Sequence, residues 1–388
     1  MSDNNSTANT IPAEWTKTLQ GEICRLGNGE KSQVAGFPYF EVKYLRGQKP
    51  KTLVNEGRFV LKDNKVIIVD GENSGEVFTI PENGYMGSTC KVLEINPKID
   101  EKFLLYFIAS KKQLYRNKKK GSAIPHLDKK LFAEMPFAYP KLLSEQQRIV
   151  AKIEELFSKL DAGIESLKKA KQQLAVYRQA VLKEAFEQSG KKKKISEVSE
   201  FVTSGSRGWA KYYTKKKGVR FVRITDLTRD GIVIQNGNIQ YLDLPNNVEG
   251  KRSLLMPADV LVSITADLGS IALVPDNIGE AYINQHIAMI RFSNRNQSKC
   301  MAYYLKSDYG QKDLLRNKRG GGKLGLGLDD IRNTQVPIFS NEIAMAIVRN
   351  IESRLSVCDQ IECTVNESLE KADVLRQSIL KKAFEGGL

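Results

Sequence analysis

The sequence contains few of the residues that most often bind metals. Only two histidines, His126 and His286, occur in 388 residues. The five cysteines lie at positions 24, 90, 300, 358 and 363, and none forms a Cys-x-x-Cys pair. A structural zinc site needs four such ligands at short spacings, and an odd cysteine count argues against a disulfide framework. We therefore expect a chain without bound metal and without disulfide bonds.

Long hydrophobic runs are also missing. No apolar run reaches the roughly 18 residues that a membrane-spanning helix needs, and the stretch 260–274 is interrupted by Asp267 and small polar residues. Residues 2–10 are polar, with neither a basic start nor a hydrophobic segment, so no signal peptide is predicted. We expect a cytoplasmic protein with no membrane partner.

Motifs of catalysis are absent as well. Gly320-Gly321-Gly322-Lys323-Leu324 lacks the spaced first glycine and the Ser/Thr after lysine of a phosphate-binding loop. The Asn/Asp-Pro-Pro-aromatic tetrapeptide of adenine methyltransferases does not occur. Asp70 with Asp100-Glu101-Lys102 matches nucleases only in residue type, a coincidence expected in a chain with 45 acidic residues. We expect no catalytic residue and no cofactor bound by this chain.

Positive charge is abundant. The chain has 60 Lys and Arg against 45 Asp and Glu, which gives a net charge of +15 and a pI near 9.4. Such a surface attracts polyanions. DNA, RNA and anionic membrane surfaces are the candidates that charge alone leaves open.

The sequence contains an internal repeat. Val176 to Glu187 and Val374 to Glu385 match at an offset of 198 residues, and Ile153-Glu154 matches Ile351-Glu352 at the same offset. Further matches occur in the same order: Val66 to Gly75 with Val260 to Gly269, Ile80 to Asn83 with Val274 to Asn277, and Leu114 to Lys118 with Leu314 to Lys318. Several matches in one order indicate a tandem duplication.

Each copy ends in a long helical pattern. Ser144-Glu145-Gln146-Gln147 fits a capping box, and no proline follows before Glu187. Apolar residues recur every seven positions, which is typical of coiled coils; they are Ile153, Leu160, Leu167, Leu174 and Val181, then Ile351, Cys358, Val365, Ala372 and Ile379. The alternative is an amphipathic helix packed on its own domain. We favour the coiled coil, because each helix has a twin of equal length.

These patterns predict an α+β fold. Two α/β globular domains (residues 1–142 and 191–339), rich in short β-type runs and turn residues, alternate with two long helices (143–190 and 340–388). The helices are expected to pair as an antiparallel coiled coil in a pseudo-two-fold tandem repeat. The polar, basic segment 188–194 marks the junction between the copies.

Basic side chains gather at equivalent places in the two copies. Residues 111–130 hold eight Lys and Arg against one acid, and the equivalent stretch surrounds Gly320 to Gly322. Lysine and arginine neutralise phosphates, and glycine lets the backbone approach a duplex.

A second cluster, Ser204 to Tyr213, mixes hydrogen-bond donors with aromatic rings that can reach base edges. A solvated surface is the alternative for the basic loops, burial is the alternative for Trp209 and Tyr213, and His126 and His286 fit polar contacts better than catalysis. The DNA-binding candidates are Lys31, Lys43, Arg116, Lys118, Lys119, Lys120, Ser122, His126, Ser206, Arg207, Lys211, Tyr212, Arg223, Gln285, His286, Arg316, Lys318, Arg319 and Lys323.

Four segments resemble the specificity subunits of type I restriction–modification systems. They are the helix entry Leu143 to Ile149, the helix exit Tyr177 to Phe186, the opening Pro12-Ala13-Glu14-Trp15 and the segment Ile283-Asn284-Gln285-His286. The resemblance extends over essentially the whole chain and is most specific in the helices. The second helix entry departs from it, with Asn341-Glu342-Ile343-Ala344 in place of Glu-Gln-Gln-Arg.

The resemblance implies a non-catalytic, sequence-specific DNA-binding subunit. Its two target-recognition domains each read one half of a bipartite site in double-stranded DNA. The helices act as spacer, since about 43 helical residues extend roughly 65 Å, and dock two methyltransferase subunits and then restriction/translocase subunits. S-adenosylmethionine, ATP and Mg are expected on those partner subunits. The partner-binding candidates are Arg178, Gln179, Phe186, Arg376, Gln377 and Phe384.

Two other functions fit the sequence less well. A stand-alone modification or restriction enzyme is disfavoured because no cofactor or metal motif occurs. A purely structural coiled-coil scaffold is disfavoured by two globular domains with matched basic loops. The sequence does not give the DNA target or the length of its gap.

Overall fold

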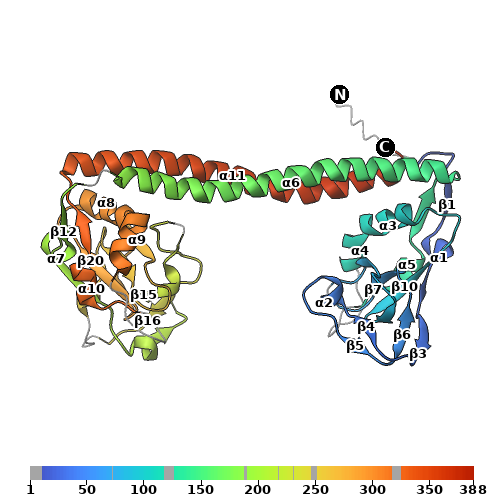
Figure 1. Cartoon of the computed structure of the whole chain (residues 1–388), viewed down its shortest axis with the longest axis horizontal. Helices are drawn as coiled ribbons and strands as arrows, with labels where there is room; N and C mark the ends of the chain where they lie inside the picture. The colour runs from blue at the N-terminus through green and yellow to red at the C-terminus, as the bar shows by residue number, and fades with distance from the viewer. Residues whose placement is uncertain are drawn as a thin grey trace. The chain divides into compact units, whose positions relative to one another are not determined.

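The computed structural model describes residues 11–71, 73–117, 126–187, 190–216, 218–229, 231–245, 251–316 and 325–388. The chain forms two compact units: unit 1 combines residues 1–167 with 367–388, and unit 2 comprises residues 168–366. Each unit contains one globular part and a stretch of each long helix, α6 (Leu143–Phe186) and α11 (Asn341–Phe384) (Figure 1). None of the described helices is long and apolar enough to cross a membrane.

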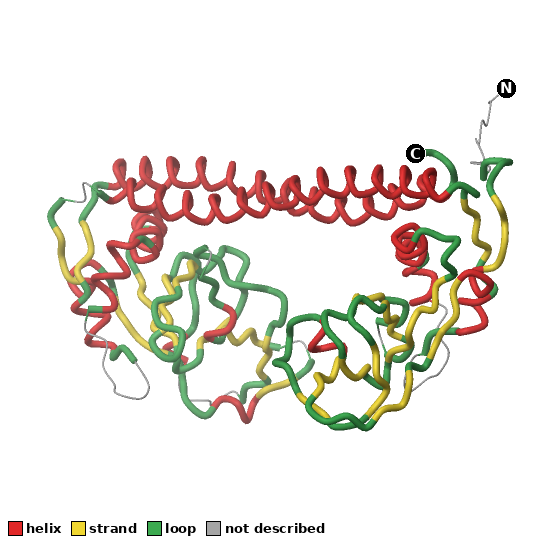
Figure 2. Tube along the Cα trace, turned by 45° about the vertical axis from the view of Figure 1, so that its right-hand side comes forward, coloured by secondary structure: helices red, strands yellow, loops and turns green. Residues whose placement is uncertain are grey.

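The globular part of unit 1 precedes α6 and mixes short strands with short helices (Figure 2). Its elements are β1 (Thr16–Leu19), α1 (Gln20–Ile23), β2 (Cys24–Gly27), β3 (Glu30–Ser32), β4 (Phe37–Phe40), α2 (Val42–Leu45), β5 (Leu53–Val54), β6 (Gly57–Val60), β7 (Lys65–Ile68), β8 (Val77–Thr79), β9 (Gly84–Met86), β10 (Cys90–Ile95), α3 (Glu101–Ser110), α4 (Lys112–Asn117), α5 (Lys129–Ala133) and β11 (Pro136–Tyr139).

The globular part of unit 2 lies between α6 and α11 in the sequence. Its elements are β12 (Lys192–Lys194), α7 (Ile195–Val198), β13 (Phe201–Ser204), η1 (Trp209–Tyr212), β14 (Tyr213–Thr214), β15 (Val219–Val222), η2 (Ile224–Asp226), β16 (Gln240–Leu242), η3 (Lys251–Ser253), β17 (Val260–Ser263), β18 (Ile271–Leu273), β19 (Ala281–Ile283), β20 (Ile287–Arg291), α8 (Arg295–Lys306), α9 (Asp308–Leu315), α10 (Leu328–Asn333) and β21 (Gln335–Pro337).

The two globular parts share one topology. In each, the first and last strands pair with each other, as β1 with β11 and as β12 with β21. Each has a four-stranded antiparallel sheet in the same order, β2-β10-β7-β8 and β13-β20-β17-β18. A further sheet in each contains one parallel pair, β4 with β9 and β15 with β19. The predicted duplication and mixed fold class are therefore confirmed.

The long helices pair antiparallel within each unit. In unit 1, Arg376 contacts Asp161 and Arg148 Nη2 donates to the carbonyl oxygen of Leu388 at 3.0 Å. In unit 2, Arg178 contacts Asp359 at 2.7 Å, and Glu184 contacts Arg354. Residue numbers rise along α6 as they fall along α11, which defines the antiparallel direction. All five heptad positions predicted in α11 are buried, so the coiled coil is confirmed.

The C-terminal end of each long helix completes a hydrophobic core. Phe384 of α11 packs edge-on against Phe103 and Phe107 of α3, with ring centroids 5.1 and 5.4 Å apart. Phe186 of α6 packs in the same way against Tyr304 of α8, at 5.4 Å. Both phenylalanines are less than a tenth exposed. Burying such rings against a sheet-covering helix fixes each helix end to its globular part.

Candidate nucleic-acid interface

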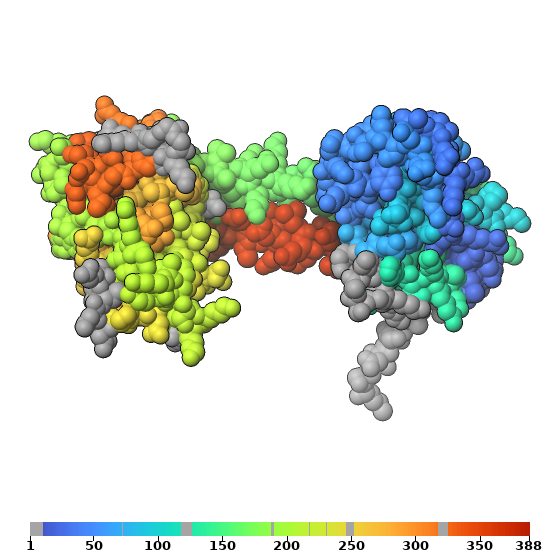
Figure 3. All heavy atoms as spheres, turned by 90° about the horizontal axis from the view of Figure 1, so that it is seen from below, coloured from blue at the N-terminus to red at the C-terminus, as the bar shows by residue number. Residues whose placement is uncertain are grey.

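A cleft of about 1100 Å³ opens in the globular part of unit 2. Three segments that are far apart in the sequence line it: residues 204–212 after β13, Thr265 after β17, and Gln285 before β20. Arg252 and residues 326–328 complete the walls. Figure 3 views the globular part of each unit from the side remote from its long helices. The cleft brings together five predicted DNA-binding residues, namely Ser206, Arg207, Lys211, Tyr212 and Gln285.

The first wall of the cleft depends on a close approach between two strands. A Cβ atom on Gly205 would lie 2.0 Å from the carbonyl oxygen of Ile283, so only glycine fits there. Trp209 is buried against Tyr282 and Phe221, which anchors the loop. The loop therefore holds the exposed side chains of Arg207 and Lys211 at the cleft.

The second wall carries a chain of polar contacts. His286 Nδ1 lies 2.7 Å from Thr265 Oγ1, and its Nε2 lies 3.0 Å from Gln285 Nε2. The backbone amide of His286 donates to Asn284 Oδ1 at 3.2 Å. His286 is thus engaged through both ring nitrogens by residues that line the cleft.

Unit 1 has a smaller cleft of about 320 Å³ at the equivalent turn, between β7 and β8. Lys43, Asp70 and Asn73 line it. His126 Nδ1 lies 2.7 Å from Asp70 Oδ1, and Arg116 Nη2 donates to Asn73 Oδ1 at 3.0 Å. The structure therefore gathers three predicted residues of the first copy, Lys43, Arg116 and His126, around this turn.

Three other candidates lie away from the two clefts. Lys31 is exposed on β3, opposite Arg58 of β6. Arg223 is turned toward Asp226, at 3.3 Å, and the carbonyl oxygen of Asn238, at 2.8 Å. Arg316 is exposed at the C-terminal end of α9. Of these three, Arg223 has a contact pattern that indicates a structural role.

The lysine-rich candidates lie outside the described residues; they are Lys118, Lys119, Lys120, Ser122, Lys318, Arg319 and Lys323. The residues that follow them in the two copies occupy equivalent places. His126 forms a β-bridge with Asp70, and Gly325 forms one with Thr265. Both basic segments therefore rejoin the described chain beside the cleft of their own unit.

Sequence reasoning missed two contributors to the larger cleft, Thr265 and Arg252. Thr265 lies inside the duplicated segment Val260 to Gly269. The repeat therefore marked the segment, but it did not show that the Thr265 side chain lines a cleft. Arg252 carries no sequence signal. It comes to the cleft through η3 and the β-bridge between Leu254 and Tyr282.

The acidic residues that match a nuclease pattern in residue type form structural contacts instead. Asp100 caps α3 by accepting from the amide of Phe103 at 2.9 Å. Glu101 pairs with Lys65, Lys102 pairs with Glu154, and Asp70 contacts His126 instead. Among the described residues, no group of three or more His, Cys, Asp or Glu is arranged to hold a metal ion.

A matched pair of grooves lies beside the long helices, one within each unit. The groove of unit 2, about 780 Å³, is lined by Arg178, Gln179 and Leu182 of α6, Asp359 of α11 and Tyr303 of α8. The groove of unit 1, about 660 Å³, is lined by the equivalent residues Arg376, Gln377, Leu380, Asp161 and Tyr106. Both volumes are in the range typical of ligand-binding pockets in proteins.

The two grooves share their chemistry. Each has an arginine paired across the helices with an aspartate, an adjoining glutamine amide and a tyrosine on the opposite wall. Burial raises the pKa of Tyr303 and of Tyr106, and each phenol lies beside a glutamate of its own unit, Glu352 and Glu154. The duplicated helix motif thus builds the same groove twice.

The six predicted partner-binding residues divide between groove and core. Arg178, Gln179, Arg376 and Gln377 line the grooves. Phe186 and Phe384 instead have buried rings that pack against the cores of their own units, and their role in partner binding stays a prediction. The helical period places them one turn beyond the groove-lining leucines, on the inward face of each helix.

The comparisons with known proteins agree with this architecture. The family model described as "Type I restriction modification DNA specificity domain" matches residues 12–175 and again 189–371. The chain is 25% identical to the MjaVIII specificity subunit of Methanocaldococcus jannaschii, with 93% of this chain and 91% of the relative covered. It is also 25% identical to the EcoBI specificity subunit of Escherichia coli, with 98% and 87% covered.

Two solved structures share the fold. One is a chain from a study of complex assembly and conformational transition in the type I R-M system, with a TM-score of 0.74, 18% identity, and 98% of this chain and 100% of that chain covered. The other is the HsdS subunit of Thermoanaerobacter tengcongensis, with a TM-score of 0.57, 18% identity, and 97% and 98% covered.

Proposed function

Because the chain belongs to the family of type I restriction–modification DNA specificity proteins, we propose that it reads a bipartite DNA site, one half with each globular part. Specificity subunits of this family are non-catalytic, and their partners are DNA and the other subunits of the complex. The observation that carries the proposal is the duplicated cleft. In each unit a cleft lies beside the turn between equivalent strands, β7–β8 and β17–β18, and predicted DNA-binding residues lie around both clefts.

The chemistry of the clefts supports base reading with phosphate anchoring. Glutamine, threonine and arginine side chains at the larger cleft offer the donor and acceptor groups that major-groove base edges require. The lysine-rich segments that rejoin the chain at His126 and Gly325 supply charge for backbone phosphates, which position a protein without selecting sequence.

We further propose that the two helix grooves dock two methyltransferase subunits, one for each groove. The support is their repetition, because one kind of partner binding twice requires two surfaces of the same chemistry. The methyltransferase subunits bind S-adenosylmethionine, and restriction/translocase subunits that join them bind ATP and Mg. In this proposal, the present chain sets the distance between the two half-sites and selects their base sequence.

The test is to express the chain with its cognate methyltransferase subunit and map modified adenines in the host genome. The expected result is one motif made of two specified half-sequences separated by a fixed unspecified gap. An electrophoretic assay with and without the partner checks direct binding. A motif without a gap would overturn the bipartite reading, and absence of any motif or DNA binding would overturn the proposed function itself.

A further inference from the structure

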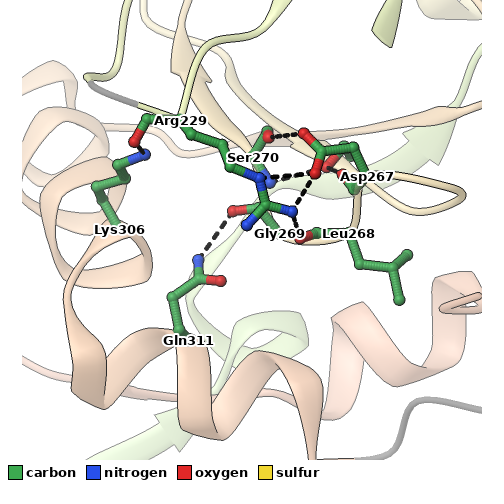
Figure 4. Close-up of polar contacts among 8 residues, drawn as sticks. Arg229, Asp267, Leu268, Gly269, Ser270, Lys306 and Gln311 are labelled. Carbon is green, nitrogen blue, oxygen red and sulfur yellow. Dashed lines mark hydrogen bonds and ion pairs between the residues drawn. The ribbon is translucent and has the colours of Figure 1, made fainter. Parts of the chain in front are cut away.

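The turn between β17 and β18 is braced from outside by an arginine. Arg229 Nε donates to Asp267 Oδ1 at 2.6 Å, and its Nη2 contacts the same oxygen. Asp267 also accepts from Ser270 Oγ at 2.9 Å, through its other oxygen. Figure 4 shows the guanidinium facing the Asp267 carboxylate across the turn. The carboxylate at the tip of this turn is therefore fixed from both sides.

Two helices hold the same assembly. Gln311 of α9 donates to the carbonyl oxygen of Gly269 at 2.9 Å, and Lys306 at the end of α8 contacts the carbonyl oxygen of Arg229 (Figure 4). Gly269 has a φ of +81°, and a Cβ there would lie 2.4 Å from Gln311 Oε1. Glycine adopts this backbone conformation without strain and leaves room for the Gln311 amide. The turn is thus tied to the rigid helical layer of unit 2.

The braced turn presents groups to the large cleft. Ala266 is exposed with a φ of +55°, a conformation that residues with a side chain rarely adopt. Thr265, next to it, lines the cleft and contacts His286 Nδ1. The tight turn therefore determines where the Thr265 hydroxyl stands.

The contacts of His286 assign the hydrogen-bond roles. The amide nitrogen of Gln285 can only donate, so His286 Nε2 accepts and Nδ1 carries the proton that is donated to Thr265. The Thr265 hydroxyl hydrogen and the carbonyl oxygen of Gln285 remain for other partners at the cleft. A donor beside an acceptor is the pattern that reads a base edge, and a glutamine amide matches adenine in the major groove.

Unit 1 holds its equivalent turn in the same manner with different residues. Arg46 pairs with Glu76 at the end of the β7–β8 turn, and Arg116 binds Asn73 within it. Arg46 and Arg229 do not align in the repeat, yet both hold the turn that borders the cleft of their unit. Each unit therefore has an arginine that pairs with an acidic residue of this turn, although the two arginines come from different places in the repeat.

We infer that Arg229 and Asp267 are positioning residues for DNA sequence choice: they set the turn so that Thr265 and Gln285 read a base of the half-site bound by unit 2. The inference rests on the proposed DNA-reading function. The pair is largely exposed, at 63% for Arg229 and 49% for Asp267. Exposed ion pairs contribute little to the free energy of folding. Removing this pair should therefore change where the turn lies without unfolding the protein.

The experiment uses the full chain with its methyltransferase subunits and maps modified adenines for the wild type and for Arg229→Ala. We expect discrimination against single-base changes in one half-sequence to fall about tenfold, the size of one lost base contact. Affinity for unrelated DNA should stay within about twofold, because phosphate contacts are untouched. Arg229→Lys, which keeps a positive charge beside Asp267, should retain most of the discrimination. Arg295→Ala, which removes another exposed ion pair of unit 2, with Asp276, serves as the control and should leave discrimination unchanged.

The outcomes separate the inference from the function beneath it. Full discrimination in Arg229→Ala, at an unchanged unfolding temperature, overturns the inference. Equal loss in both half-sequences overturns it as well. A wild-type complex without any sequence preference instead overturns the proposed function.

Discussion

At the scale of residues, the helix exit motif serves two purposes within about two turns of helix. Arg178 and Gln179 face a groove, whereas Phe186 is buried among core residues of unit 2. The same division holds for Arg376, Gln377 and Phe384 in unit 1. One motif thus couples a docking surface to the core that supports it.

This division predicts opposite results for two substitutions. Phe186→Ala should lower the free energy of unfolding by about 3–5 kcal/mol, because it leaves a cavity under Tyr304. Gln179→Ala, at an exposed position, should change it by less than about 0.5 kcal/mol. Chemical denaturation gives both values.

Co-purification with the methyltransferase subunit completes the comparison. Gln179→Ala should weaken the complex while leaving the fold intact, and Gln377→Ala is the matched variant in the other groove. A stable Phe186→Ala variant would contradict the core assignment. Unchanged partner binding in the double variant Gln179→Ala with Gln377→Ala would contradict the docking grooves.

At the scale of elements, the sequence predicted the helices far better than the sheets. The seven-residue repeat and the absence of proline placed a helix from Ser144 to about Glu187, and α6 runs Leu143–Phe186. Helical periodicity is local, so it can be read from one segment. The domain boundaries that we drew around the helices remain a prediction.

Short strands were predicted poorly because their partners are distant. Lys192–Lys194 was read as part of a junction, yet it forms β12 by pairing with Gln335–Pro337, more than 140 residues away. Three exposed lysines carry no strand signal of their own. For the same reason the sequence identified residues 204–213 and Gln285 separately, without showing that the cleft joins them.

The helices should set distance while the globular parts set base identity. Inserting about one helical turn, four residues, between Lys168 and Gln173 should therefore change the unspecified gap in the DNA site and leave both half-sequences unaltered. Mapping modified adenines measures gap and half-sequences together. A four-residue substitution in the same segment, without insertion, controls for local damage to the helix. An unchanged gap with altered half-sequences would contradict this division of roles.

At the scale of the whole molecule, charge and duplication together predict how DNA is held. The net charge of +15 favours binding through phosphates, and this contribution falls with salt because releasing counterions gains less free energy in a more concentrated solution. Both basic segments rejoin the chain at their own cleft, beside Asp70 in unit 1 and beside Thr265 in unit 2. We therefore expect each segment to serve one half-site.

Neutralising Lys118, Lys119 and Lys120 together should weaken binding to all sequences and reduce the slope of log affinity against log salt by up to about 3, roughly one unit for each lost phosphate contact. The preferred sequence should not change, because phosphates carry no base identity. Replacing Lys318, Arg319 and Lys323 is the matched variant. Footprints of the two variants should lose protection on opposite halves of the site. Full footprints with both would mean that these segments are ordinary solvated surface, and the recognition surface would then have to be sought first in the cleft around Arg207 and His286.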